Sequence, residues 1–155
     1  MKTRLNMAPI AILVVVGMIA ASRGALAQSS VDVAVNQTAS TACSAGESVA
    51  LNGNLHVQVS AAADPNGGTR YEIGMSSSLT GVGQSTQASY SGSGSYGYGF
   101  TTGDSPAQVN LELGTPLKSQ GSAPDLRLSQ SVNITVDSSG SISASVISSS
   151  TDCAQ

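Results

Sequence analysis

The chain has 155 residues, with six basic and nine acidic side chains, one His and two Cys. Three of the six basic residues lie within the first 23 positions, so the rest of the chain is acidic and lacks the basic surface of a nucleic-acid-binding protein. One His and two distant Cys are too few ligands for a zinc site, and the sequence contains no Walker phosphate-binding motif.

The first 27 residues have the layout of a secretory signal peptide. A short basic segment precedes an apolar run over positions 10–21, and Ala25-Leu26-Ala27 is a small-x-small cleavage motif. A membrane span needs about 20 apolar residues, whereas Arg23 ends this run too early. We therefore expect cleavage after Ala27 and export of a single β domain over residues 28–155. Its expected location is secreted, periplasmic or on the cell surface, with no membrane span after cleavage.

Alternating apolar and polar residues then predict roughly eight short strands and no helix. In the clearest strand, over 48–60, Leu55 and Val57 fall on one face and His56 and Gln58 on the other. The other predicted strands cover 31–35, 71–75, 86–90, 91–103, 109–113, 126–136 and 142–146.

Breaks between these strands are predicted from turn residues. Asp64-Pro65-Asn66-Gly67-Gly68 and Asp137-Ser138-Ser139-Gly140 have turn chemistry, because Pro sets one backbone angle and Gly permits positive φ. We expect a loop at 76–78, a kinked segment over 79–83, and a strand end at 114–116. Gly53, on the apolar face of its strand, predicts a bulge or the close approach of another backbone. Short strands with frequent turns favour an antiparallel β-sandwich or a partly closed barrel.

The two cysteines predict one disulfide bond that joins the two ends of the domain. Export places Cys43 and Cys153 in an oxidising compartment, and with two cysteines a monomer has a single way to pair them. Intermolecular pairing or a free thiol are the alternatives. A reactive thiol is disfavoured because no His lies near either Cys in the sequence.

An ordered set of short patterns resembles a known group of proteins. The patterns are Cys43-x-x-x-Glu47, the segments 51–59, 64–68, 81–90 and 132–140, and Asp152-Cys153. Together they resemble a group of small secreted bacterial proteins, largely uncharacterised, with one domain after a signal peptide. The chain departs from that group in having Gln87 where a Gly often stands. The resemblance implies an all-β secreted domain and carries no catalytic residues to this chain.

The residue types used in catalysis and metal binding have ordinary structural interpretations here. His56 falls on the polar face of its strand, and the sequence has no G-x-S-x-G motif or second His to accompany it. Most carboxylates lie at turns, while Glu72 and Glu112 are predicted to face solvent in mid-strand. The 64–68 segment lacks the acidic residues that complete a calcium loop, and Gly81-Val82-Gly83 is too short for a phosphate loop. We therefore predict no enzyme activity, no metal site and no cofactor.

Tyr96, Tyr98 and Phe100 form the one candidate ligand-binding patch. They alternate with glycines and therefore share one face of a strand. The rings either fill the core, because the chain has few other large side chains, or stack on sugars or on a partner's side chains. The sequence thus favours a non-catalytic exported binding or structural module with a glycan, protein or other cell-envelope partner. The alternatives are a pilus or surface-fibre subunit assembled by strand donation, and a secreted hydrolase.

Overall fold

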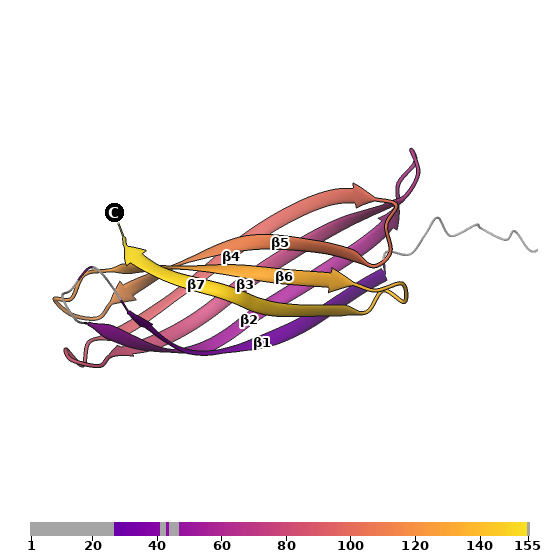
Figure 1. The fold of residues 1–155 in the computed structure, drawn as a ribbon. Helices are drawn as coiled ribbons and strands as arrows, with labels where there is room; N and C mark the ends of the chain where they lie inside the picture. The colour runs from indigo at the N-terminus through magenta and orange to yellow at the C-terminus, as the bar shows by residue number, and fades with distance from the viewer. Residues whose placement is uncertain (1–26, 41–42, 44–46, 155) are drawn as a thin grey trace, which may run out of the picture.

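The computed structural model describes residues 27–40, 43 and 47–154, and all of its regular elements are β-strands (Figure 1). In these residues no helix is long and apolar enough to cross a membrane. The predicted signal peptide, apart from Ala27, lies outside the described residues. The strands are β1 (Ala27–Ser40), β2 (Ser48–Ala63), β3 (Thr69–Gly83), β4 (Ser89–Thr102), β5 (Ala107–Ser119), β6 (Leu126–Val136) and β7 (Ile142–Cys153).

The seven strands form one antiparallel sheet in which each strand lies next to its neighbours in the chain. Long ladders join β1 to β4 and β5 to β7, but β4 and β5 pair only at Tyr90 and Ser91. The sheet curls until β7 lies beside β1, so the barrel is nearly closed (Figure 1). The predicted antiparallel β fold is confirmed, with seven strands in place of roughly eight.

The strands are longer than the sequence predicted because several expected breaks lie inside them. The predicted loop at 76–78 and the kinked segment at 79–83 both belong to β3, which pairs with β2 without interruption from Thr69 to Gly83. Ser77 tolerates its inward position because its hydroxyl lies 2.6 Å from that of Thr115 on β5. Likewise β4 begins at Ser89, so the separate strand expected over 86–90 is wrong.

The predicted strand end at 114–116 is also wrong, because β5 continues to Ser119. Pro116 has no N–H to donate, but over most of its length β5 is bonded on the β6 side only. A proline is therefore tolerated where the unpaired side of the strand needs no donor.

Alternate residues of the strands point into the barrel, and the buried ones among them form its core. Leu55, Val57 and Ile134 are buried, while His56 and Gln58 point outward, as predicted. Gly53 allows the predicted close approach, since a Cβ there would overlap the backbone oxygen of Ser78, and the β2 register shows no bulge. Other fully buried side chains include Val49, Leu51, Leu79, Leu113, Leu117, Leu126, Leu128 and Val132.

The predicted disulfide joins Cys43, which follows β1, to Cys153 at the end of β7, with the two Cα atoms 5.3 Å apart. It closes a loop of 110 residues and connects the first and last strands of the sheet. The described residues contain no free cysteine.

Candidate functional site

The candidate site begins where β5 crosses the inner face of β4. Gly92 and Gly94 lie at inward positions of β4, opposite Leu79 and Ser77 of β3. A Cβ on Gly92 would overlap the backbone oxygen of Pro116, and one on Gly94 would lie 2.5 Å from that of Gly114. The absent side chains thus let the β5 backbone pass directly against β4. We call this crossing the glycine corner.

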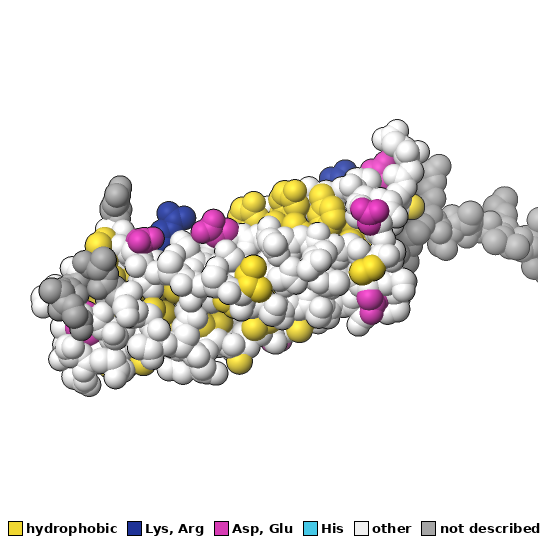
Figure 2. Space-filling view, viewed as in Figure 1, with side chains coloured by type: hydrophobic (Ala, Val, Ile, Leu, Met, Phe, Trp, Pro, Cys, Tyr) yellow, Lys and Arg dark blue, Asp and Glu magenta, His cyan; other side chains and the backbone are white. Residues whose placement is uncertain are grey.

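Beyond the glycine corner β4 runs on without β5 over it. Tyr96, Tyr98 and Phe100 occupy the same inward face, directly opposite Met75, Ile73 and Tyr71 of β3. Tyr96 is nevertheless 42% exposed and Tyr98 39% exposed, while Phe100 is half-buried against the core. Of the two alternatives left open by the sequence, the one in which the rings fill the core does not hold for the two tyrosines. Figure 2 shows a strip of hydrophobic side chains along the edge of the molecule where β4 runs.

Stacking orders two of the three rings, Tyr98 and Phe100, and we refer to all three as the aromatic ledge. Phe100 stacks on buried Tyr71 with ring centroids 5.2 Å apart, and Tyr98 stacks on Phe100 at 5.9 Å. Alternate residues of a strand are separated by about 6.5–7 Å, so Tyr96 continues the row. The ledge therefore combines an anchored end at Phe100 with two accessible phenol rings.

A trough continues from the ledge over the outer face of β5, β6 and β7. One hollow of about 450 Å³ is lined by Ser95 and Tyr96 together with Glu112, Gly114, Arg127 and Ser129. A second hollow of about 900 Å³ shares the last three of these residues and extends to Pro116, Asp152, Cys153 and Ala154. We call the two together the arginine trough.

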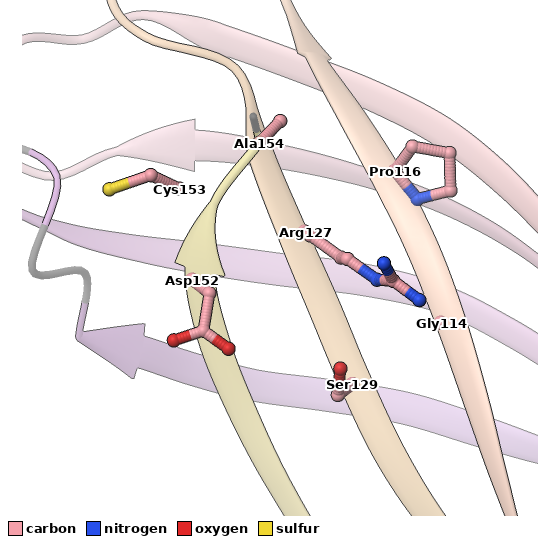
Figure 3. A pocket seen from close by; sticks show the side chains of 7 residues that line it. All are labelled: Gly114, Pro116, Arg127, Ser129, Asp152, Cys153 and Ala154. Atoms are coloured by element: carbon pink, nitrogen blue, oxygen red, sulfur yellow. The ribbon is translucent and has the colours of Figure 1, made fainter.

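Arg127 lies in the middle of this trough with its guanidinium over Gly114. A Cβ on Gly114 would come within 2.8 Å of that guanidinium, so the glycine provides the space in which it lies. In Figure 3 the Arg127 side chain extends toward Gly114 and Pro116, and away from Asp152. Although Arg127 and Asp152 are directly opposed on β6 and β7, no ion pair joins them.

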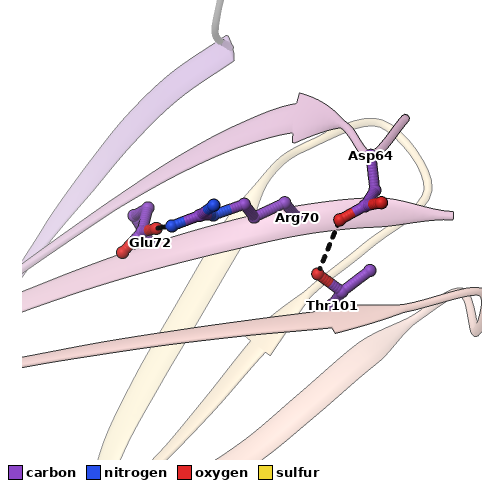
Figure 4. A network of polar contacts seen from close by, with 4 residues as sticks. All are labelled: Asp64, Arg70, Glu72 and Thr101. Atoms are coloured by element: carbon purple, nitrogen blue, oxygen red, sulfur yellow. Dashed lines mark hydrogen bonds and ion pairs between the residues drawn. The ribbon is translucent and has the colours of Figure 1, made fainter. Parts of the chain in front are cut away.

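The basic residues of the described chain differ in their pairing. Arg70 Nη2 lies 2.6 Å from Glu72 Oε1 (Figure 4), and Lys118 Nζ lies 2.7 Å from Asp125 Oδ2. Among the described residues Arg127 makes neither an ion pair nor a hydrogen bond, so its five N–H donors remain available. This makes Arg127 the basic side chain best placed to bind a ligand.

The outer side of the ledge is nearly bare of side chains. Gly97 and Gly99 face outward there, with Glu72 lying over Gly99. A shallow hollow of about 360 Å³ lies over Gly74 and Gly97, with His56, Gln58, Ser95 and Tyr96 among its lining residues. Thr101 Oγ1, at the end of the strand, donates to Asp64 Oδ2 at 3.1 Å and holds the turn after β2 against β4 (Figure 4).

Perturbed acid–base groups do not gather at the site. Burial, with the nearby charges of Glu47 and Asp125, raises the pKa of Tyr90. Hydrogen bonds lower the pKa of Asp64, Asp125 and Asp137, which lie at turns and loops. No cluster of three or more His, Cys, Asp or Glu side chains suited to a metal ion occurs in the described residues.

The sequence placed the aromatic residues of the candidate site on one face of a strand but gave no indication of its polar residues. Glu112 was correctly predicted to face solvent, yet nothing in its strand showed that Arg127 and Tyr96 would lie beside the same hollow. These residues come from three strands, and the crossing at the glycine corner brings them together. The four glycines between positions 92 and 99 were the available signal of this crossing. Glycine is uncommon inside strands, and it often marks a place where another backbone approaches closely.

Comparisons of the chain with protein-family models, curated proteins and solved structures found no match. The resemblance to small secreted bacterial proteins therefore stays a prediction, and the function has to be argued from the site itself.

Proposed function

We propose that the protein is a non-catalytic, exported binding module whose ligand is a neutral saccharide chain. The saccharide lies along the aromatic ledge and reaches into the arginine trough. An exported location follows from the predicted signal peptide, and the disulfide bond is compatible with it.

The observation that carries this proposal is the exposure of Tyr96 and Tyr98 on a face that elsewhere forms the core. Covering the part of the two rings that remains exposed would stabilise the fold, at roughly 25 cal/mol per Å² of apolar surface removed from water. Because β5 crosses β4 at the glycine corner, it does not cover the rings that lie beyond the crossing, and this stabilisation is absent. A ligand that covers the rings would recover it.

A saccharide fits both halves of the site. One face of a sugar ring consists of C–H groups and packs on an aromatic ring, while its hydroxyls need hydrogen-bonding partners at the edge. The ledge offers rings at intervals of about 6.5–7 Å, and the trough offers the guanidinium, carboxylate and hydroxyl groups of Arg127, Glu112 and Ser129.

Charge favours a neutral saccharide over an acidic one. The single guanidinium of Arg127 shares the trough with the carboxylates of Glu112 and Asp152. Figure 2 shows a basic patch beside the hydrophobic strip with acidic side chains on both sides of it. An anionic sugar would therefore meet two like charges for one opposite charge.

The arrangement around His56 supports a binding role over a hydrolytic one. Asp32, His56 and Ser76 are directly opposed on β1, β2 and β3, and His56 Nδ1 lies 2.8 Å from Asp32 Oδ1. No hydrogen bond joins Ser76 to His56 in the described chain. In addition, all three residues lie on an exposed sheet face, where water is not excluded.

The test is a screen of neutral and acidic glycans against the wild type, Tyr96→Ala and Tyr98→Ala, with melting temperatures measured in parallel. We expect binding of a neutral glycan by the wild type and at least tenfold weaker binding by Tyr96→Ala, with little change in melting temperature. Val82→Ala, which removes an exposed apolar side chain from the outer face of β3, is the matched control and should bind normally. Absence of any glycan bound by the wild type would refute the proposal.

A further inference from the structure

The barrel is also left without a ladder between its first and last strands, β1 and β7. Every paired interface joins antiparallel strands, whereas these two strands run in the same direction. An antiparallel meander of seven strands leaves its first and last strands running parallel. No backbone ladder joins β1 to β7. The hydrogen bonds across this seam involve side chains: Ser29 Oγ donates to the Gly140 carbonyl at 2.9 Å, and Ser149 Oγ donates to Gln37 Oε1 at 3.0 Å.

A groove of about 490 Å³ runs along this seam. It is lined by five consecutive residues of β1, Val33 to Gln37, by Ala144 to Ser149 of β7, and by Gln130 of β6. Consecutive residues of both strands line it, so it follows the two strand edges. A bulge in the β6–β7 pairing, between Ser131 and Val132, falls beside the same stretch of β7, and a bulge bends its strand.

The floor of the groove contains polar groups without partners. Gln130 is 0% exposed, and neither its amide nitrogen nor its amide oxygen has a hydrogen-bond partner in the described chain. The same holds for Nε2 of Gln37, which lines the groove from β1. Buried amide groups are ordinarily satisfied, so these atoms point to a bound group that donates and accepts hydrogen bonds.

We propose that the β1–β7 groove is an acceptor site for an extended, uncharged peptide segment of a partner protein, which enters as an eighth strand. Such a strand runs antiparallel to both β1 and β7; its entry separates the two edges, replaces the Ser149–Gln37 hydrogen bond and completes an all-antiparallel barrel. The two edges offer it unpaired backbone groups, as in other cases of strand addition. A hydrogen-bonding side chain at its inward position satisfies Gln130.

The lining residues determine the chemistry of the occupant. None of the twelve residues that line the groove is charged, so a charged inward side chain would lose its hydration without gaining a partner. Val35 and Val146 flank the polar floor and match small apolar side chains. Ile147 is 58% exposed beside the groove and is available to cover an outward-facing residue of the peptide.

A different protein, rather than a second copy of this chain, is the source of the strand. Every described segment longer than a turn or short loop already belongs to the sheet. Self-association of the purified protein would contradict this assignment.

The experiment uses the full-length exported protein and a set of fluorescent hexapeptides in which Val alternates with Ser, Thr, Asn or Gln. Matched peptides carry Asp, or Pro, at one central position, because Pro removes a backbone donor and disrupts the strand. Binding is measured by fluorescence anisotropy, and the contact region by hydrogen exchange of 33–37 and 144–149. Sedimentation velocity reports self-association.

We expect at least one uncharged peptide to bind and to slow exchange in both segments, and its Asp and Pro versions to bind at least tenfold more weakly. Gln130→Leu should weaken binding of that peptide about tenfold, whereas Gln58→Leu, on the outer face of β2, should not. The proposal is overturned if no peptide slows exchange at the seam, if Gln130→Leu binds equally well, or if the chain self-associates through these edges. Saccharide binding by Tyr96 and Tyr98 is measured separately and does not affect this result.

Discussion

The barrel is interrupted twice, at the glycine corner between β4 and β5 and at the seam between β1 and β7. At the glycine corner the backbones touch, and the two buried hydroxyls of Ser77 and Thr115 hydrogen-bond each other. At the seam the backbones are not paired, and the buried amide of Gln130 has no partner in the described chain.

This difference shows two ways in which a curled sheet can leave surface for binding. The glycine corner is closely packed, and its proposed binding surface arises because β4 extends past it as the aromatic ledge. The seam is incompletely packed, and its proposed binding surface is the groove itself. We therefore expect changes at the corner to destabilise the fold, and removal of the unpartnered amide inside the seam to stabilise it or to leave stability unchanged.

Loss of the disulfide should have the largest effect, because this bond ties the two strands of the seam. In the chain-entropy model, a loop of 110 residues corresponds to about 4–5 kcal/mol of stability. Reduction, or replacement of Cys43 and Cys153 by Ala, should lower the free energy of unfolding toward that extent in urea titrations. Hydrogen exchange should increase first in β1 and β7, whereas equal increases in β3 and β4 would contradict the role given to the seam.

Filling the glycine corner should be the next most damaging change. A Cβ at Gly92 would overlap the Pro116 carbonyl, which is backbone and cannot rotate away, so Gly92→Ala should cost about 3 kcal/mol. Gly97→Ala is the matched control on the same strand. Its nearest atom is the Ile73 carbonyl at 3.9 Å, and we expect a change within about 0.5 kcal/mol. Equal costs in thermal unfolding would show that β5 does not cross at Gly92.

Removing a buried polar group should change the free energy of unfolding in opposite directions at the glycine corner and at the seam. Thr115→Val removes one of the paired hydroxyls and leaves that of Ser77 buried alone, at a cost of about 1–3 kcal/mol. Gln130→Leu removes an unpartnered buried amide and should raise the free energy of unfolding by about 1 kcal/mol. Chemical denaturation of the two variants distinguishes the outcomes. A destabilised Gln130→Leu would mean that the amide is already satisfied in the free protein.

The smallest of these effects on stability is expected from acid, which should weaken the turn that begins at Asp137, at one end of the seam. Hydrogen bonds from the Ser139 hydroxyl and from the N–H groups of Ser141 and Ser139 lower the pKa of Asp137 below its ordinary value of 3.8. The folded pKa is lower than the unfolded one, so this stabilisation is present above pH 3.8 and is lost as the pH falls through the folded value. The melting temperature of the wild type should therefore fall more between pH 5 and about pH 3 than that of Asp137→Asn. Parallel curves would contradict this.

Period-two patterns allowed much of the fold to be predicted from the sequence, because they are local. The alternation around Leu55 and His56 assigned both faces of β2 correctly, and the number of cysteines predicted the disulfide. Strand ends were predicted less well. Ser76, Ser77 and Ser78 look like a loop in isolation, but the ladder with β2 and the hydroxyl of Thr115 keep them in β3.

The sequence by itself therefore determined the β class, the inward and outward faces, the turns at Gly67 and Gly140, and the pairing of Cys43 with Cys153. The tertiary structure alone decided which inward residues are covered. Tyr98 and Ile134 obey the same alternation, yet one is exposed and the other is buried, because β5 crosses β4 at Gly92 and Gly94. A strand's pattern selects a face through its own backbone geometry, whereas covering that face depends on strands distant in the chain.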